Sequence, residues 1–165
     1  DSFKNWRGMM NSDGRRIKRA LNIKLNSVKY LSKNEVDNLK EIQIIDTYLE
    51  KRQSDIESYN KGHEINKELL LNGRNLTNLG VFRKYAQTYI ENHSGINKEM
   101  MIMVRQLAPT TQGIPLEIYA FTADKRWESY EYIMADIFDH LIAAVPYFDL
   151  EVFELPTGSS FINKA

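Results

Sequence analysis

The sequence predicts an α+β fold, a two-layer sandwich with the element order βαββαβ. Four segments alternate polar and apolar residues, which is the pattern of half-buried strands. Between them run two amphipathic stripes at helical spacing, which would cover one face of a four-stranded antiparallel sheet. This order is that of the ferredoxin-like split βαβ unit. We expect strands over Arg15–Leu25, Glu99–Leu107, Leu116–Thr122 and Leu150–Leu155, and helices over Asn75–His93 and Arg126–Val145.

The first strand follows a turn at Asp13-Gly14, a dipeptide typical of hairpins. Its apolar side chains, among them Ile17 and Leu21, share one face. An apolar and aromatic segment, Phe3–Met10, precedes the turn. Two strands joined by one turn are too small for a domain, so we interpret residues 1–14 as the remnant of an upstream β domain.

Asn34–Asn60 carries the longest helical pattern of the chain, with Asn34 as the expected N-cap and Gly62 as the expected stop. Two interpretations stay open. The helix lies on the core of its own domain, or it packs against a neighbouring subunit. The polar segment Lys61–Gly73 is expected to be a loop or a short helix. Together, residues 34–73 form a predicted helical insertion.

Each helix of the predicted sandwich has its own boundary residues. We expect Thr77 to cap the first helix and Asp124 to cap the second, with Pro146 as its stop. The apolar stripes predict four buried side chains above all: Leu79, Phe82, Trp127 and Ile137. The small and polar tail over residues 159–165 is expected to be disordered.

Composition excludes several classes of protein. Lys plus Arg and Asp plus Glu both number 22, so no net charge draws the chain to nucleic acid or to an anionic membrane. The absence of cysteine excludes disulfides and thiolate metal sites and suits a reducing compartment. The longest apolar run, Leu141–Val145, is far shorter than the roughly 20 residues that span a bilayer, so we expect a soluble chain. Because it starts at Asp1, we expect a piece of something longer.

Asp136 and His140 form the most suggestive pair of titratable residues. Their i, i+4 spacing places them on one helix face, with Asp139 adjacent. The functional interpretation is a metal or acid–base pair, although the further ligands that zinc needs and the HExxH spacing are missing. The structural interpretation, a surface pair near the end of a helix, is favoured. We therefore predict no catalytic, cofactor-binding or metal residues.

Other motifs carry weaker signals. Asn72–Asn75 and Gly80 lack the spacing of a phosphate-binding loop, so a loop entering a helix is favoured. RNA-recognition modules share the strand order, but Met101–Leu107 contains no aromatic residue, which disfavours them. A small-ligand regulatory domain of the same topology stays open. The basic cluster Arg15–Arg19 is either a charged edge strand or a surface that faces anionic lipid or lines a charged vestibule.

Six tracts of the chain together resemble a family of bacterial channels. Val104–Thr122 and Ala135–His140 are its most specific parts, and the residues 33–71 match least. The resemblance rests on Phe3–Met9, Gly14–Arg19, Asn75–Arg83, Val104–Pro109, Pro115–Thr122 and Ala135–His140. These tracts resemble the small-conductance mechanosensitive channels (MscS family), within the miniconductance, YbdG-like type.

The resemblance implies the cytoplasmic region of an ion channel at the bacterial inner membrane. Residues 1–14 would end the middle β domain, and residues 15–158 would form the C-terminal α/β domain. Its partners would be further copies of itself, as a homoheptamer, and the membrane through upstream helices. No nucleic acid, small-molecule substrate, cofactor or enzymatic activity is implied. The function implied is to form part of the vestibule below a pore that protects against osmotic downshock. The alternative is a free-standing ligand-binding regulatory domain of ferredoxin-like topology.

Overall fold

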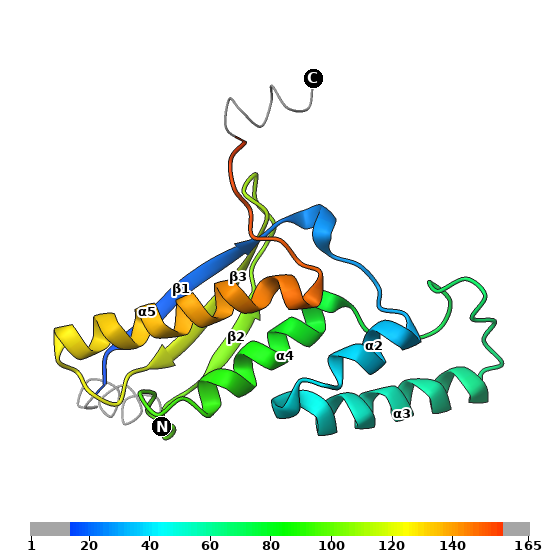
Figure 1. Ribbon diagram of the computed structural model, residues 1–165, viewed down its shortest axis with the longest axis horizontal. Helices are drawn as coiled ribbons and strands as arrows, with labels where there is room; N and C mark the ends of the chain where they lie inside the picture. The colour runs from blue at the N-terminus through cyan, green and yellow to red at the C-terminus, as the bar shows by residue number, and fades with distance from the viewer. Residues whose placement is uncertain (1–13, 157–165) are drawn as a thin grey trace, which may run out of the picture.

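A computed structural model of the chain describes residues 14–156. Within this range the chain is α+β, with a three-stranded antiparallel sheet in the order β1-β3-β2 (Figure 1). Residues 1–13 of the expected β remnant and the expected disordered tail, 159–165, lie outside the described residues. The strands are β1 (Arg16–Ile23), β2 (Met103–Gln106) and β3 (Ile114–Phe121), and the α-helices are α2 (Lys33–Leu39), α3 (Asp46–Gly62), α4 (Asn78–Glu91) and α5 (Trp127–Ala144).

The sheet is built around β3, which pairs with β1 along its whole length and with β2 on its other side. In β1 the alternation of residues works as predicted, because Ile17, Leu21 and Ile23 are buried while Arg16 and Lys18 are exposed. Figure 1 shows α4 and α5 on the same side of the sheet. Their stripes meet the apolar face of the strands and close one core.

The predicted fourth strand, Leu150–Leu155, is reduced to a single antiparallel bridge between Val152 and Ile23. Two hydrogen bonds flank it: Phe153 N–H donates to the Asn22 carbonyl at 2.9 Å, and Lys24 N–H donates to the Glu151 carbonyl at 2.8 Å. The returning chain meets β1 only at its end, just before the 3-10 helix η1 (Leu25–Ser27). The rest of the outer edge of β1 pairs with no strand among the described residues.

The predicted helix Asn34–Asn60 is in fact two helices, α2 and α3, separated by a turn and a 3-10 helix, η2 (Gln43–Ile45). The cap is Ser32 rather than Asn34. Its hydroxyl accepts from Glu35 N–H while the Glu35 carboxylate accepts from Ser32 N–H, which is a capping box. The break lets Ile45 pack in the core together with Leu49, and both are fully buried.

The prediction that Trp127 is buried was wrong, because its side chain is 66% exposed. The other three predicted core residues, Leu79, Phe82 and Ile137, are buried. Trp127 is the first residue of α5. Helical side chains lean towards the N-terminus of their helix, so a first-turn side chain covers space beyond the helix end rather than the sheet beneath it.

Candidate functional site

An aromatic–histidine cluster joins α4 to α5, formed by Tyr85, Tyr89, His93, Asp136 and His140. The Tyr85 hydroxyl lies 2.6 Å from Nε2 of His140, and the Tyr89 ring stacks parallel on the His140 ring with centroids 3.8 Å apart. A turn further along, Nε2 of His93 lies 2.8 Å from an Asp136 carboxylate oxygen. The cluster arises because the α4 residues recur every four positions and so share one helix face.

The two residues of the predicted Asp136–His140 pair therefore have different partners, on α4 and just after its end. Asp136 contacts His93, and His140 contacts Tyr85 and Tyr89. Burial raises the pKa of the Tyr85 phenol, and burial, the Asp136 charge and Tyr85 raise the pKa of Tyr89. The donor in the hydrogen bond between the Tyr85 hydroxyl and Nε2 of His140 depends on the imidazole tautomer. The contacts link α5 to α4 and to His93 just beyond it.

The part of the chain that the structure describes contains no set of ligands for a metal ion. Within residues 14–156, no three His, Asp or Glu side chains gather as a metal ion would require. Within the cluster, His93 already contacts Asp136, and His140 already contacts Tyr85. The segment Asn72–Asn75, which was compared with a phosphate-binding loop, has a structural role. Gly73 has a φ of +74°, and a Cβ there would lie 2.3 Å from Oδ1 of Asn60, which accepts from Arg74 N–H.

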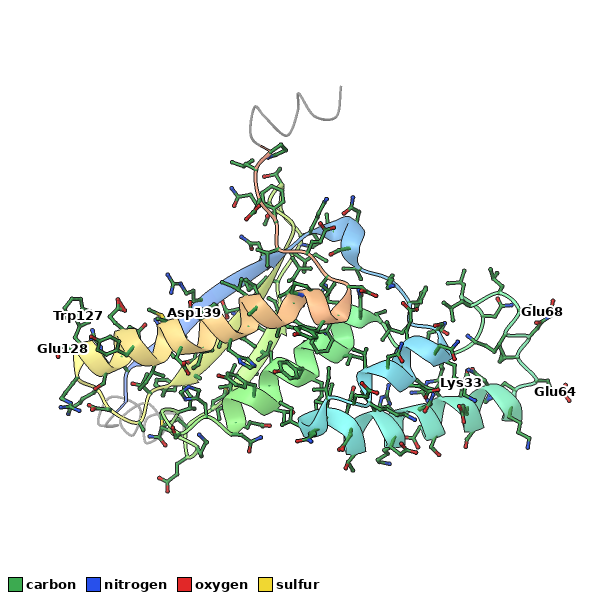
Figure 2. All side chains as sticks on the ribbon, in the orientation of Figure 1. Lys33, Glu64, Glu68, Trp127, Glu128 and Asp139 are labelled. Carbon is green, nitrogen blue, oxygen red and sulfur yellow. The ribbon has the colours of Figure 1, made fainter. Side chains whose placement is uncertain are left out.

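The insertion holds a groove of about 620 Å³ between α2, α3 and the loop that follows α3. Charged side chains stand at its rim, including Lys33, Glu64 and Glu68, which Figure 2 labels. The volume lies within the range of small-molecule sites, which is roughly 300–1,000 Å³. We call it the insertion groove, and its apolar lining comprises Leu31, Val36, Ile56, Ile65, Leu70 and Leu76.

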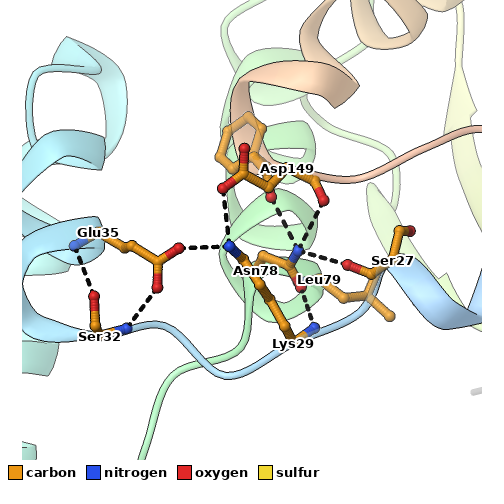
Figure 3. Close-up of polar contacts among 8 residues, drawn as sticks. Ser27, Lys29, Ser32, Glu35, Asn78, Leu79 and Asp149 are labelled. Carbon is orange, nitrogen blue, oxygen red and sulfur yellow. Dashed lines mark hydrogen bonds and ion pairs between the residues drawn. The ribbon is translucent and has the colours of Figure 1, made fainter.

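A buried polar hub at Asn78 connects the insertion to the sandwich (Figure 3). The Asn78 amide donates to the carbonyls of Ser27 and Phe148, both at 3.0 Å, and accepts from Lys29 N–H at 2.9 Å. Nearby, the Lys29 ammonium bridges two carboxylates, Glu35 at 2.5 Å and Asp149 at 3.0 Å. The hydrogen bond from Lys29 is the main cause that lowers the pKa of Glu35. These contacts fix where α4, α2 and the end of α5 meet.

The predicted basic cluster Arg15–Arg19 is split between the two faces of the sheet. Arg15 and Arg19 lie on the helix side, over the rings of Tyr130 and Phe138 at 4.9 and 5.4 Å. Arg16 and Lys18 alternate with them and point to the opposite face. Across that face, Arg105 pairs with the buried Glu117 at 2.8 Å.

Comparison with protein-family models finds no model that matches the chain. Within residues 14–156, no helix has both the length and the apolar character that crossing a membrane requires. Sequence reasoning missed the partners of the two titratable residues, although Tyr89 and His93 belong to the stripe expected to face the core. It also missed Asn78. The only signal was a polar residue next to the predicted cap Thr77, which does cap α4 by accepting from Gly80 N–H at 3.0 Å.

Proposed function

We propose that this chain is the cytoplasmic domain of a mechanosensitive ion channel of the MscS family, on the cytoplasmic side of a bacterial inner membrane. The observation that carries the proposal is the resemblance of six tracts between Phe3 and His140. Its most specific tracts fall on β2, β3 and α5, which are elements of the sandwich rather than of the insertion.

We also propose the ferredoxin-like βαββαβ topology as the finer description of the fold. The observed order β1-β3-β2 agrees with the inner part of that topology. The bridge from Val152 to Ile23 lies on the free edge of β1, where the fourth strand of the topology belongs. The fourth strand would thus be present in shortened form.

In this role the domain assembles and performs no reaction. Its partners would be further copies, as a homoheptamer in the full-length channel, and upstream helices would join it to the membrane. The domain would form part of the vestibule below the pore, and the channel would release solutes on osmotic downshock. The aromatic–histidine cluster and the Asn78 hub would serve to keep the domain rigid.

Two experiments test the proposal. The native reading frame should encode hydrophobic spans of about 20 residues upstream of Asp1. The full-length protein should then restore survival of osmotic downshock to bacteria that lack their own mechanosensitive channels. A reading frame without such spans, or a well-expressed protein that gives no protection, would count against the proposal.

The second candidate function is a free-standing regulatory domain that binds a small ligand. The insertion groove favours it, because its volume and mostly apolar lining are those of ligand sites. The reading frame separates the two candidates, since a free-standing domain needs no membrane spans. A screen of metabolites for a shift in melting temperature, repeated with Ile56→Glu in the groove, tests the second candidate directly.

A further inference from the structure

Two opposite sides of the molecule carry opposite charge. Helix α5 contains four carboxylates and no lysine or arginine. Strand β1 contains three basic residues and no acidic one. Figure 1 shows α5 in front of the strands, so the outer side of α5 and the far face of the sheet look in opposite directions.

The outer stripe of α5 is acidic and aromatic. Its residues recur at spacings of four and three and lie opposite the buried Ile137 and Leu141. Figure 2 shows Trp127 and Glu128 at the start of this helix and Asp139 further along. Neither Glu128 nor Asp139 has an ion-pair partner within residues 14–156. We call it the α5 stripe, and it comprises Glu128, Tyr132, Ala135, Asp139 and Ile142.

The stripe exposes more apolar surface than a solvent-facing helix needs. Tyr132 is 77% exposed and Ile142 is 47% exposed. From Glu128 to Ile142 the stripe is about 21 Å long, at 1.5 Å per residue. Apolar side chains between carboxylates form a surface suited to a partner that is apolar at its centre and cationic at its margins.

The far face of the sheet has that composition. Arg16 and Lys18 stand on β1 at one margin, and Arg105, which already pairs with Glu117 of the same face, stands on β2 at the other. Between them lie apolar side chains, including Tyr119 on β3 and the exposed Met103 on β2. The eight residues of β1 extend for about 26 Å, so the face is long enough to accommodate the α5 stripe. We call these residues, Arg16, Lys18, Met103, Arg105 and Tyr119, the basic sheet face.

The basic side chains of this face form no ion pairs with α5 of the same chain. Arg15 and Arg19, on the helix side, lie over the rings of Tyr130 and Phe138 instead of pairing with carboxylates. Arg16 and Lys18 have no ion-pair partner among the residues the structure describes. Among the residues 14–156, Glu128 and Asp139 on one surface and Arg16 and Lys18 on the other therefore carry unlike charges without an ion-pair partner.

We propose that the α5 stripe of one copy docks on the basic sheet face of the next copy. The signs of the charges select this pairing. Two α5 stripes facing each other would oppose carboxylates, and two sheet faces would oppose cations. Only the unlike pairing brings a carboxylate of the stripe to Arg16 and Lys18. The contact is heterologous, so copies add head to tail and form a ring where the rotation closes.

The inference rests on the proposed function in one respect, namely that the partner is the chain itself. Its strength follows from its size. A stripe about 21 Å long and roughly 10 Å wide buries a few hundred Å² in total, counting both partners. Stable interfaces bury about 1,200 Å² or more, so an isolated pair is weak and reversible. Because its charges are exposed, the contact weakens in salt.

The test is a charge swap followed by sedimentation velocity on the chain of residues 1–165 at low and high salt. One variant is Glu128→Lys/Asp139→Lys, and the other is Arg16→Glu/Lys18→Glu. We expect each alone to weaken self-association about tenfold or more, because like charges then meet. An equimolar mixture should regain wild-type association, since each altered face meets an unlike one. Circular dichroism checks that each variant is folded.

The control is Glu41→Lys/Glu57→Lys on the insertion, which changes the net charge as much as the α5 variant does. We expect it to associate like the wild type. Variants that associate normally, a mixture that stays dissociated, or a wild type with no association at low salt would each overturn the docking. So would loss of association in Leu69→Ser/Leu71→Ser, which removes the two most exposed leucines of the insertion and leaves both docking faces intact. Survival of osmotic downshock is measured separately, so the docking can fail while the proposed function stands.

Discussion

At the scale of single residues, Asn78 is the side chain whose loss should cost most among the polar residues. Its side chain is fully buried, and it satisfies two carbonyls and two N–H groups from three segments of the chain. In Asn78→Ala these groups lose their partner inside the protein. We expect the free energy of unfolding to fall by about 2–4 kcal/mol.

Urea denaturation of the two proteins measures this effect. The matched control is Asn38→Ala on α2, an exposed asparagine whose replacement should change stability by less than about 0.5 kcal/mol. An Asn78→Ala protein as stable as this control would show that the hub contributes nothing to the fold.

Asp124 gives a prediction about pH. Hydrogen bonds from the Arg126 side chain and backbone lower the pKa of Asp124 to about 2, from an ordinary value of 3.8. A carboxylate with a lowered pKa stabilises the folded state above its unfolded pKa, and this stabilisation disappears as pH falls through the folded pKa. Asp124 should therefore contribute to the loss of stability between about pH 4 and pH 2.

The variant Asp124→Asn removes this titration. Thermal melts as a function of pH should show a shallower loss of stability below pH 4 in the variant than in the wild type. The matched control is Asp139→Asn, on the same side of the molecule but without a hydrogen bond to Arg126. If the melting temperatures of wild type and Asp124→Asn fell equally steeply below pH 4, Asp124 would not be the group that causes this loss of stability.

Sequence reasoning predicted the roles of some single residues correctly and those of others wrongly. It placed Thr77 as the cap of α4, because a cap depends on local spacing. It expected Asp124 to cap α5, whereas the helix begins after Arg126 and the carboxylate accepts from Arg126 N–H two residues on. It paired Asp136 with His140 because only their shared helix is visible in the sequence. Their actual partners lie on α4 and just after its end, more than 40 positions away.

At the scale of elements, α5 offers a clean comparison of its two faces. Ile137 is fully buried against the sheet, whereas Ile142 lies on the outer stripe. Truncating Ile137 to Ala removes buried methyl groups and leaves a cavity, so we expect a loss of about 2–5 kcal/mol. The same truncation at Ile142 should cost less than about 1 kcal/mol.

Chemical denaturation of the two alanine variants provides the measurement. Equal losses would mean that α5 does not pack through the predicted face. The comparison is fair, because both substitutions are identical and both stand well inside the same helix.

Most elements could be predicted from the period of their apolar residues. The strands β1 and β3 lie where apolar residues recur every second position, and the helices α4 and α5 lie where they recur about every 3.6 positions. The break between α2 and α3 was missed, because the apolar spacing continues across it while Ile45 and Leu49 both reach the core. The fourth strand was overestimated, because alternation alone does not reveal that the returning chain meets β1 only at Ile23.

At the scale of the whole molecule, we expect the chain of residues 1–165 to assemble weakly and the full-length protein to assemble strongly. In the proposed channel, much of the contact area belongs to the upstream β domain and the membrane helices. An interface below about 1,000 Å² is usually transient. Sedimentation of the chain at micromolar concentration tests this expectation. A stable heptamer would show that this domain carries the assembly by itself.

The central claim is that the domain belongs to a channel gated by membrane tension. The most direct measurement is patch-clamp recording of the full-length protein in membranes of bacteria that lack their own mechanosensitive channels. The account predicts currents that appear when suction stretches the patch and that are absent from patches without the protein. A full-length protein that reaches the membrane and passes no current at any tension short of patch rupture would contradict it.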